Sequence, residues 1–466
     1  MKQDFSSYQS PFSWRYGTEE MRKIFSEERK YELWRRIWVS LAEVQHEAGL
    51  INKEELADLR KNEKNIDIEK IFEIEKETRH DVVAGIREFA GKAKTGGGKI
   101  HLGATSMDVT DNADAVRIRE AGELVEKSLK ELLGKLSKKI ETYSKLTCLG
   151  LTHLQPAEPT TVGYRLAFYG QDLMLGLKFL RFALGEFKAK GIKGAVGTGA
   201  SFEKLLEGKT MSVGKLEKKV MKKLGLKAVL VSSQVYPRQF DFLTLSALAS
   251  IGAGMSKLAT DLRLLQNPSM GEWSEPFGKS QVGSSAMPFK KNPISSEKIC
   301  SLSRFLAKLP QVAWENAALS WLERSLDDSA NRRIIISEGF LAVDEILRVG
   351  KKIISGLVVN ERRIGLNLEQ YGIFSAVEVV LMEVVKKGGD RQRWHEELRK
   401  ICLEAGNEVK KGKDNPLREM LVSNKELKKL LSEREMTKAL DISRYIGEAS
   451  KRALRLVKII NREIAK

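Results

Sequence analysis

Apolar side chains recur at steps of three and four residues along most of the chain, which is the period of an amphipathic α-helix. A first pattern runs from Thr18 to Gly49, a residue that favours a helix end. After Asp111, a suitable N-cap, a second pattern marks one face of a helix of about seven turns. The apolar positions of the two patterns are Trp34, Ile37, Trp38, Leu41, Val44 and Ala48, and then Ile118, Val125, Leu129, Leu132, Leu136 and Ile140.

Further helices are expected in the middle of the chain. The stretch 239–266 is apolar almost all round, as in a helix buried in the core of a bundle. Helical patterns return at about 296–325 and 332–357, whereas strand-like stretches are rare, with 228–231 as one candidate. The sequence therefore predicts an all-α protein.

We expect three helical domains. Residues 1–110 form the first, and residues 111–359 form a central bundle of long helices. Residues 360–466 are more polar and form a smaller third domain.

Length and cysteine content point to a soluble, cytoplasmic protein. The uncharged apolar run from Phe242 to Ser256 is shorter than the roughly 18 to 20 residues that cross a bilayer, so no membrane partner is expected. The three scattered cysteines form no CxxC pair, and the first ten residues lack a basic region leading into an apolar run.

The charge balance favours anionic ligands. Lys and Arg total 80 against 62 Asp and Glu, a formal net charge of +18. A nucleic-acid-binding scaffold is one class that fits, and salt-dependent retention on DNA or RNA would test it. Both signs are interspersed along the helices, however, so much of the excess is explained by solvated surface, and we expect no nucleic-acid partner.

Three of the five histidines lie in segments that do not look helical. His80, His101 and His153 stand in polar, loop-like stretches, while His46 and His395 have helical, charged neighbours. Because histidine is the side chain best suited to proton transfer near neutral pH, the first three are candidates for catalysis.

The segment 278–293 is unlike the rest of the chain. Its glycines and prolines exclude a regular helix, and it is rich in hydroxyl, ammonium and amide donors. It is either a lid that grips an anion or a surface linker. Free backbone N–H groups of a helix that begins near Ser295 would add to the attraction of a carboxylate or phosphate.

A second cluster of donors lies at 323–333. Arg324, Ser329 and Arg333 suit a phosphate, and the alternative is that the arginines pair with Asp327 and Asp328. The glycine-rich pieces 96–99 and 194–199 do not follow predicted strands, so they are expected to be turns.

These segments together resemble the adenylosuccinate lyases, a branch of the fumarase/aspartase superfamily, over essentially the whole chain. The superfamily lid motif GSSxMPxKxNP corresponds to 283–293. Argininosuccinate lyases share that motif but are not expected to carry the other strings. These are RHD at 79–81, HLGATS at 101–106, THLQPAEPTTVG at 152–163 and DDSANRR at 327–333.

The resemblance implies elimination of fumarate from adenylosuccinate and from succinyl-aminoimidazole carboxamide ribotide (SAICAR), without a cofactor or metal. It assigns the base to Ser284 and the general acid to His153, with His80 and Lys290 as the other catalytic residues. The carboxylates would be bound by Thr105, Ser106, Thr152 and Asn292, together with Lys290. The phosphate end would be bound by Arg15, Tyr16, Arg324, Ser329 and Arg333. Arg79, Asp81, Gln234 and Lys298 would complete the substrate-binding set.

The resemblance also implies a homotetramer whose central helices form a shared bundle, with each active site built from three chains. A different class remains open. His80 and Asp81, with His46 upstream, would also fit a metal-dependent phosphohydrolase, which a metal assay would reveal.

Overall fold

The computed structural model describes residues 6–466 and consists mainly of helices, which confirms the predicted all-α class. The chain forms two compact units. The first unit contains residues up to 129, 176–253 and 301–348, and the second contains 130–175, 254–300 and 349–466. The division into three domains stays a prediction. The boundaries of the two units fall inside α6 (Ser106–Thr142), α7 (Val162–Glu186), α10 (Gln239–Leu265), α11 (Ile294–Leu306) and α13 (Asp328–Ser355).

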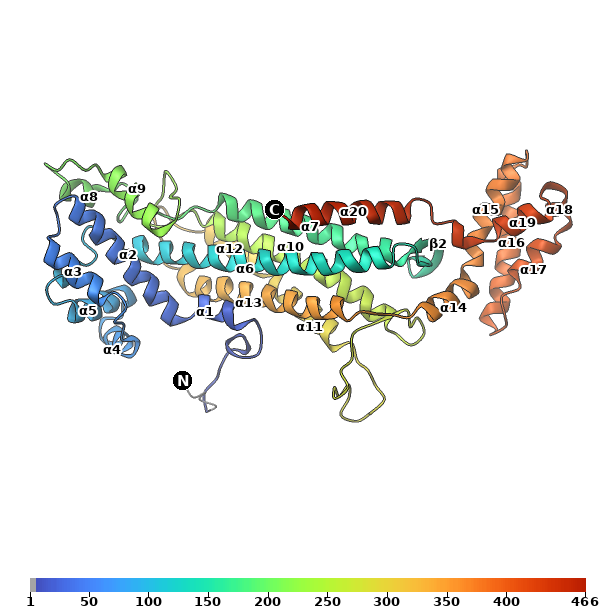
Figure 1. Ribbon diagram of the computed structural model, residues 1–466, viewed down its shortest axis with the longest axis horizontal. Coiled ribbons are helices and arrows are strands. Elements are labelled where there is room, and N and C mark those ends of the chain that lie inside the picture. The colour runs from blue at the N-terminus through green and yellow to red at the C-terminus, as the bar shows by residue number, and fades with distance from the viewer. Residues whose placement is uncertain (1–5) are drawn as a thin grey trace. The chain divides into compact units, whose positions relative to one another are not determined.

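In the first unit, α2 (Glu27–Glu47) packs against its neighbours α3 and α9 (Figure 1). The apolar series predicted from Trp34 to Ala48 is buried there. The predicted helix is nevertheless broken near Ser26, whose hydroxyl accepts a hydrogen bond from Arg29 N and caps α2. The other helical elements of this unit are η1 (Pro11–Ser13), α1 (Glu19–Ile24), α3 (Lys53–Asn62), α4 (Ile68–Thr78), α5 (Asp81–Lys92), η2 (Gly97–Lys99), α8 (Ala200–Leu205), α9 (Val213–Leu224) and α12 (Leu309–Ala318).

Helix α6 begins at Ser106, five residues before Asp111, so the predicted N-cap is wrong. Asp111 is buried inside the helix and forms an ion pair with Arg238. Thr105 precedes the helix, and its N–H donates to the carboxylate of Asp108 in the first turn. The apolar face predicted from Ile118 to Ile140 is buried throughout, as expected.

Helix α10 confirms the predicted interior helix at 239–266. Its length and composition, with a mean hydropathy of 1.3 over 18 residues, would suffice to cross a membrane, although the run 242–256 alone is too short. Of this 18-residue stretch, 56% is buried inside the protein. Core helices of soluble proteins can be equally long and apolar, so these properties do not identify a membrane span.

Two other local predictions are corrected. The pattern at 296–325 is not one helix, because α11 ends at Leu306 and a new helix, α12, begins at Leu309 with Pro310 in its first turn. No helix follows Ala318 before α13. The candidate strand 228–231 contributes only one isolated bridge, between Ala189 and Ala228.

In the second unit, two strands that were not predicted form a hairpin, β1 (Thr147–Thr152) and β2 (Gln155–Thr161). β3 (Trp273–Ser274) pairs with β4 (Val358–Val359). Helix α20 (Ala449–Ile464) follows a cluster of short helices with its own apolar core. That cluster contains α15 (Ile373–Lys386), α16 (Arg391–Lys410), α17 (Leu417–Ser423), α18 (Lys425–Leu430), α19 (Glu433–Ala439) and η3 (Ile442–Arg444), and α14 (Glu361–Tyr371) precedes it and packs against β1.

Candidate active site

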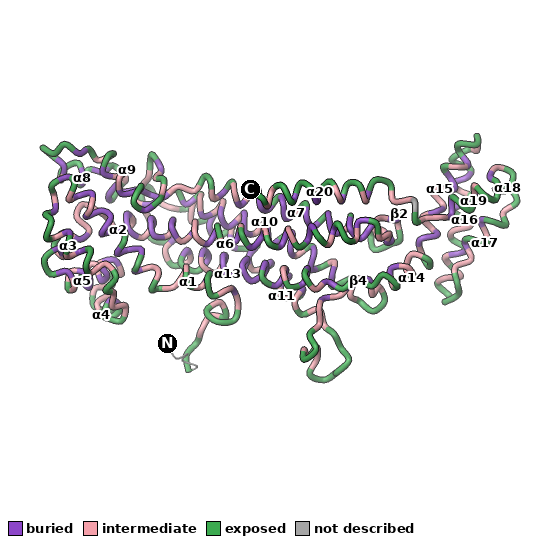
Figure 2. The backbone as a smooth tube through the Cα atoms, in the orientation of Figure 1, coloured by how far each residue is buried: buried purple, intermediate pink, exposed green. Residues whose placement is uncertain are grey.

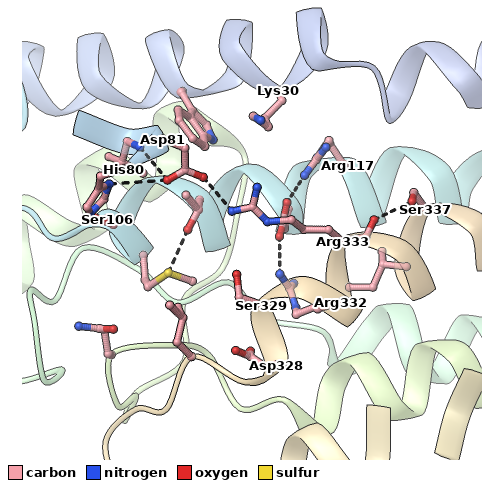
Figure 3. Close-up of a pocket in the computed structure, with 18 of the residues that line it drawn as sticks. Lys30, His80, Asp81, Ser106, Arg117, Asp328, Ser329, Arg332, Arg333 and Ser337 are labelled. Atoms are coloured by element: carbon pink, nitrogen blue, oxygen red, sulfur yellow. Dashed lines mark hydrogen bonds and ion pairs between the residues drawn. The ribbon is translucent and has the colours of Figure 1, made fainter. Parts of the chain in front are cut away.

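A cavity of about 620 Å³ lies in the first unit and gathers segments that are far apart in the sequence (Figure 3). Its walls come from α2, the turn between α4 and α5, the start of α6, the segment before α10, and the start of α13. The sequence-predicted residues that line it are Arg79, His80, Asp81, Thr105, Ser106, Gln234, Arg324, Ser329 and Arg333.

The RHD segment connects two helices. Arg79 ends α4 in the left-handed conformation, with a φ of 53°. His80 caps α5, because its Nδ1 accepts a hydrogen bond of 3.4 Å from Val83 N, so the neutral ring carries its proton on Nε2. Asp81 opens α5 and forms an ion pair of 2.8 Å with Arg333 (Figure 3). This pair connects α5 to α13 at the cavity.

The first turns of α6 present one face to the cavity. Ser106, Thr110, Asp114 and Arg117 follow one another at helical spacing and all line it. Arg117 was not predicted from the sequence, although its helical spacing from Ser106 indicates a shared face. Lys30 was missed in the same way, since it shares a face of α2 with Glu27 and Trp34.

A network of buried ion pairs forms part of the cavity wall. Arg238 joins Asp111 to Asp328, and Arg332 joins Asp114 to Asp241. Burial raises the pKa of Asp111 above its ordinary value, against the pull of Arg238. Burial has the same tendency at Asp114, but Arg117 and Arg332 outweigh it and hold the pKa of that carboxyl below its usual range.

The cavity is lined by more positive than negative side chains. Seven Lys and Arg side chains line it against five Asp and Glu. Arg324 pairs with Asp328 at 2.9 Å, so the ion-pair interpretation of 323–333 applies to part of its guanidinium. Guanidinium and ammonium groups of this kind suit a phosphate or carboxylate.

His101, unlike His80, is not among the residues that line this cavity. Its Nδ1 accepts a hydrogen bond of 3.1 Å from Trp38 Nε1, and burial lowers the pKa of the ring to about 4. His101 is therefore a neutral, structural residue near neutral pH. Arg15 and Tyr16 also lie in the first unit, before α1, and are absent from the cavity lining.

The remaining predicted residues belong to the second unit. Thr152 and His153 are exposed at the end of the β1–β2 hairpin, whose two-residue turn is formed by His153 and Leu154. Both turn residues have positive φ, 55° and 59°, a conformation that favours Asn and Gly. A strained turn of this kind is typical of a functional position.

The segment 278–293 contains no helix and is mostly exposed (Figure 2). The hydroxyl of Ser284 accepts hydrogen bonds from Ala286 N, at 3.3 Å, and Met287 N, at 3.1 Å. Asn292 Nδ2 donates to the carbonyl of Gly283 at 2.8 Å. A Cβ at Gly283 would collide with the carbonyl oxygen of Lys290, so the backbone at Gly283 lies close to the backbone at Lys290. Lys290 itself is exposed.

The start of α11 corrects one prediction. The N–H groups of Ser295 and Ser296 are not free for a ligand, because both donate to the buried carboxylate of Glu275, at 3.2 and 2.6 Å. Lys298 lies farther along α11 and is half-buried. Within residues 6–466, no group of three or more His, Cys, Asp or Glu side chains is placed to hold a metal ion.

Two family models match the chain. One is described as lyase and matches residues 15–305, and the other is described as adenylosuccinate lyase C-terminus and matches residues 374–456.

Relatives named adenylosuccinate lyase match nearly the full length. The chain is 41% identical to the one from Schistosoma mansoni over 426 residues, 90% of this chain and 88% of that one. It is 37% identical to the one from Saccharomyces cerevisiae over 97% of this chain and 95% of that one. The relative from Methanocaldococcus jannaschii is 37% identical over 94% of this chain and 93% of that one.

Solved structures share the fold at lower identity. The 3-carboxy-cis,cis-muconate lactonizing enzyme from Pseudomonas putida matches with a TM-score of 0.86 and 22% identity, over 98% of this chain and 100% of that one. A fumarate lyase from Mesorhizobium sp. BNC1 matches with a TM-score of 0.84 and 22% identity, over 97% and 99% of the two chains.

Proposed function

Because the chain belongs to the adenylosuccinate lyase family of the fumarase/aspartase superfamily, we propose that it eliminates fumarate from adenylosuccinate, giving AMP, and from SAICAR. The observation that carries the proposal is the positively charged cavity of the first unit. It gathers RHD, Thr105 and Ser106 with Arg324, Ser329 and Arg333. A substrate with one phosphate and two carboxylates suits such a cavity.

The reaction needs a base next to a stabilised carboxylate. A proton leaves the carbon beside one succinyl carboxylate, the electron pair forms the double bond of fumarate, and the C–N bond breaks. In the proposal Ser284 takes the proton. Hydrogen bonds from Ala286 N and Met287 N support this role, because two N–H groups already directed at the hydroxyl oxygen would stabilise its alkoxide. Lys290 would add positive charge in the closed lid.

The departing nitrogen must be protonated, and we assign this step to His153. Its exposed position in a strained turn supports a functional role. His80 orients the substrate or His153, with Nε2–H as its available donor. Thr105, Ser106, Thr152, Lys290 and Asn292 bind the carboxylates, and Arg15, Tyr16, Arg324, Ser329 and Arg333 bind the phosphate end. Arg79, Asp81, Gln234 and Lys298 complete the substrate-binding set.

We also propose that the active protein is a cytoplasmic homotetramer whose sites each combine segments of three chains. An exposed apolar stripe on α7 supports burial by another subunit. The part of this stripe that lies in the second unit contains Tyr164, Phe168 and Leu175, whose exposed fractions are 38%, 50% and 65%.

The direct test is the ultraviolet change on adding adenylosuccinate to the purified protein, with chromatography of the products. We expect AMP and fumarate in equal amounts, and SAICAR should yield fumarate as well. A protein that leaves adenylosuccinate intact would overturn the proposed function. If the protein converted adenylosuccinate but not SAICAR, only the proposed activity on SAICAR would be overturned.

The base is tested by replacing Ser284 with alanine. Turnover should fall by at least about a thousandfold, while substrate binding stays largely intact because the phosphate contacts lie elsewhere. Ser285→Ala is the matched control, since it removes the neighbouring hydroxyl of the same loop. If Ser285→Ala were the more damaging change, the base would be misassigned.

A further inference from the structure

Thr105 and Ser106 line the cavity. A buried carboxylate outside the cavity lining fixes the backbone at Thr105. Asp108, which is fully buried, accepts the N–H of Thr105 at 2.9 Å. The same carboxylate accepts the N–H groups of Lys193, at 3.0 Å, and Gly194, at 3.1 Å. It thus joins the first turn of α6 to the loop 190–194, which lies far away in the sequence.

The positive partner of Asp108 is Lys190, which is also fully buried. Its ammonium group forms an ion pair with Asp108 and donates to the carbonyl of Gly194 at 2.9 Å. The loop is fixed a second time at Gly191, which exchanges two hydrogen bonds with the side chain of Asn112 on α6, at 3.0 and 3.1 Å. Four donors fill the acceptor sites of the carboxylate, so its position is strongly determined.

A buried ion pair is a costly way to join two segments, because both charges lose their hydration. Well-packed apolar side chains would connect the loop and the helix equally well. An apolar contact would not, however, fix the N–H of Thr105 in direction. Fixing that group sets the backbone from which the hydroxyls of Thr105 and Ser106 extend toward the cavity.

We propose that Asp108 and Lys190 are positioning residues for substrate binding. The pair holds Thr105 and Ser106 where their hydroxyls meet a carboxylate of the substrate, without touching the substrate itself. The inference rests on the proposed function, in which these two hydroxyls bind a carboxylate. A small displacement of such groups weakens a contact strongly.

The test compares steady-state kinetics on adenylosuccinate for Lys190→Met, Lys190→Arg and a control, Lys193→Met. The control removes an ammonium group from the same loop whose partner is Glu217 and leaves the N–H of Lys193 in place. We expect Lys190→Met to raise KM by about tenfold or more with a smaller change in kcat. Lys190→Arg, which keeps the charge, should restore most of the affinity, and Lys193→Met should stay close to the wild type.

A purely structural pair would predict lower stability with unchanged kinetic constants in the folded protein, and that result would overturn the proposal. Asp108→Asn keeps the shape of the side chain and supplies a second variant if Lys190→Met does not fold. It should raise KM in the same way, and an unchanged KM in the folded Asp108→Asn protein would equally overturn the proposal. A wild-type protein without lyase activity would instead overturn the proposed function, and this inference with it.

Discussion

At the scale of single residues, His101 makes stability depend on pH. Its pKa is lowered by burial from 6.5 to about 4 in the folded chain. Between these values the unfolded chain binds a proton that the folded chain does not, so stability falls as the pH falls through this window. The loss amounts to roughly 3 kcal/mol when complete.

This prediction is checked by urea unfolding of the wild type and of His101→Asn between pH 7 and pH 4. Asparagine tolerates the positive φ of His101, 65°, and does not titrate in this range. The stability of the variant should decline less steeply with falling pH, because all other groups are common to both proteins. Parallel curves would contradict the prediction, and a loss of turnover matching His153→Gln would contradict the structural role of His101.

A second prediction at the scale of single residues concerns the contribution of Arg117 to substrate binding. Arg117 places a positive charge in the cavity wall, so Arg117→Met should raise KM by about tenfold and make binding less sensitive to salt. Arg332 continues to pair with Asp114 in this variant. Arg119→Met is the control, since Arg119 lies two residues farther along α6 and contacts the carbonyl of Gly225 instead. Equal kinetic effects of the two changes would exclude a specific role for Arg117.

At the scale of elements, the turn of the β1–β2 hairpin is strained, so a substitution that relieves the strain should raise the free energy of unfolding. Leu154 is 61% exposed and has a φ of 59°. Leu154→Gly should stabilise the protein by about 0.5 to 1 kcal/mol, because the relief of a left-handed residue exceeds the added freedom of the unfolded chain. Leu154→Ala keeps the Cβ and should give no gain. Urea midpoints of both variants would decide.

The elements also show what the sequence could predict. Helical periods located the long helices, because an apolar face repeats over many turns, as in the series ending at Ile140. The helix ends were predicted less accurately than the helices themselves. Asp111 looked like an N-cap, but the buried contact with Arg238 keeps it inside α6. The hairpin was missed because His153 and Leu154 lack the Asn–Gly pattern that marks such turns.

For the site residues, too, local motifs were predictable from the sequence and long-range contacts were not. Short motifs identified RHD, Thr105 and Ser106, and the structure gathers them with Arg324, Ser329 and Arg333. Arg117 and Lys30 were overlooked, because a charged residue in a helix resembles solvated surface until its face is known. The role of Asp108 depends on a loop more than eighty residues away, which no local pattern reveals.

At the scale of the whole molecule, the proposed sharing of sites between subunits predicts complementation. Inactive Ser284→Ala and His153→Gln proteins should rescue each other when they are unfolded and refolded together. Random mixing of equal amounts leaves roughly a quarter of the sites with both residues intact, so activity should return to about that fraction of wild type. Mixed oligomers that stay inactive would show that Ser284 and His153 of one site come from the same subunit.

The contact between Gly283 and the carbonyl of Lys290 has a consequence for laboratory evolution of this chain. Backbone atoms occupy the space of a Cβ there, so no flexible side chain can move aside to admit one. In a saturation library scored for turnover, position 283 should return only glycine, while the exposed neighbours Val282 and Phe289 should accept many replacements.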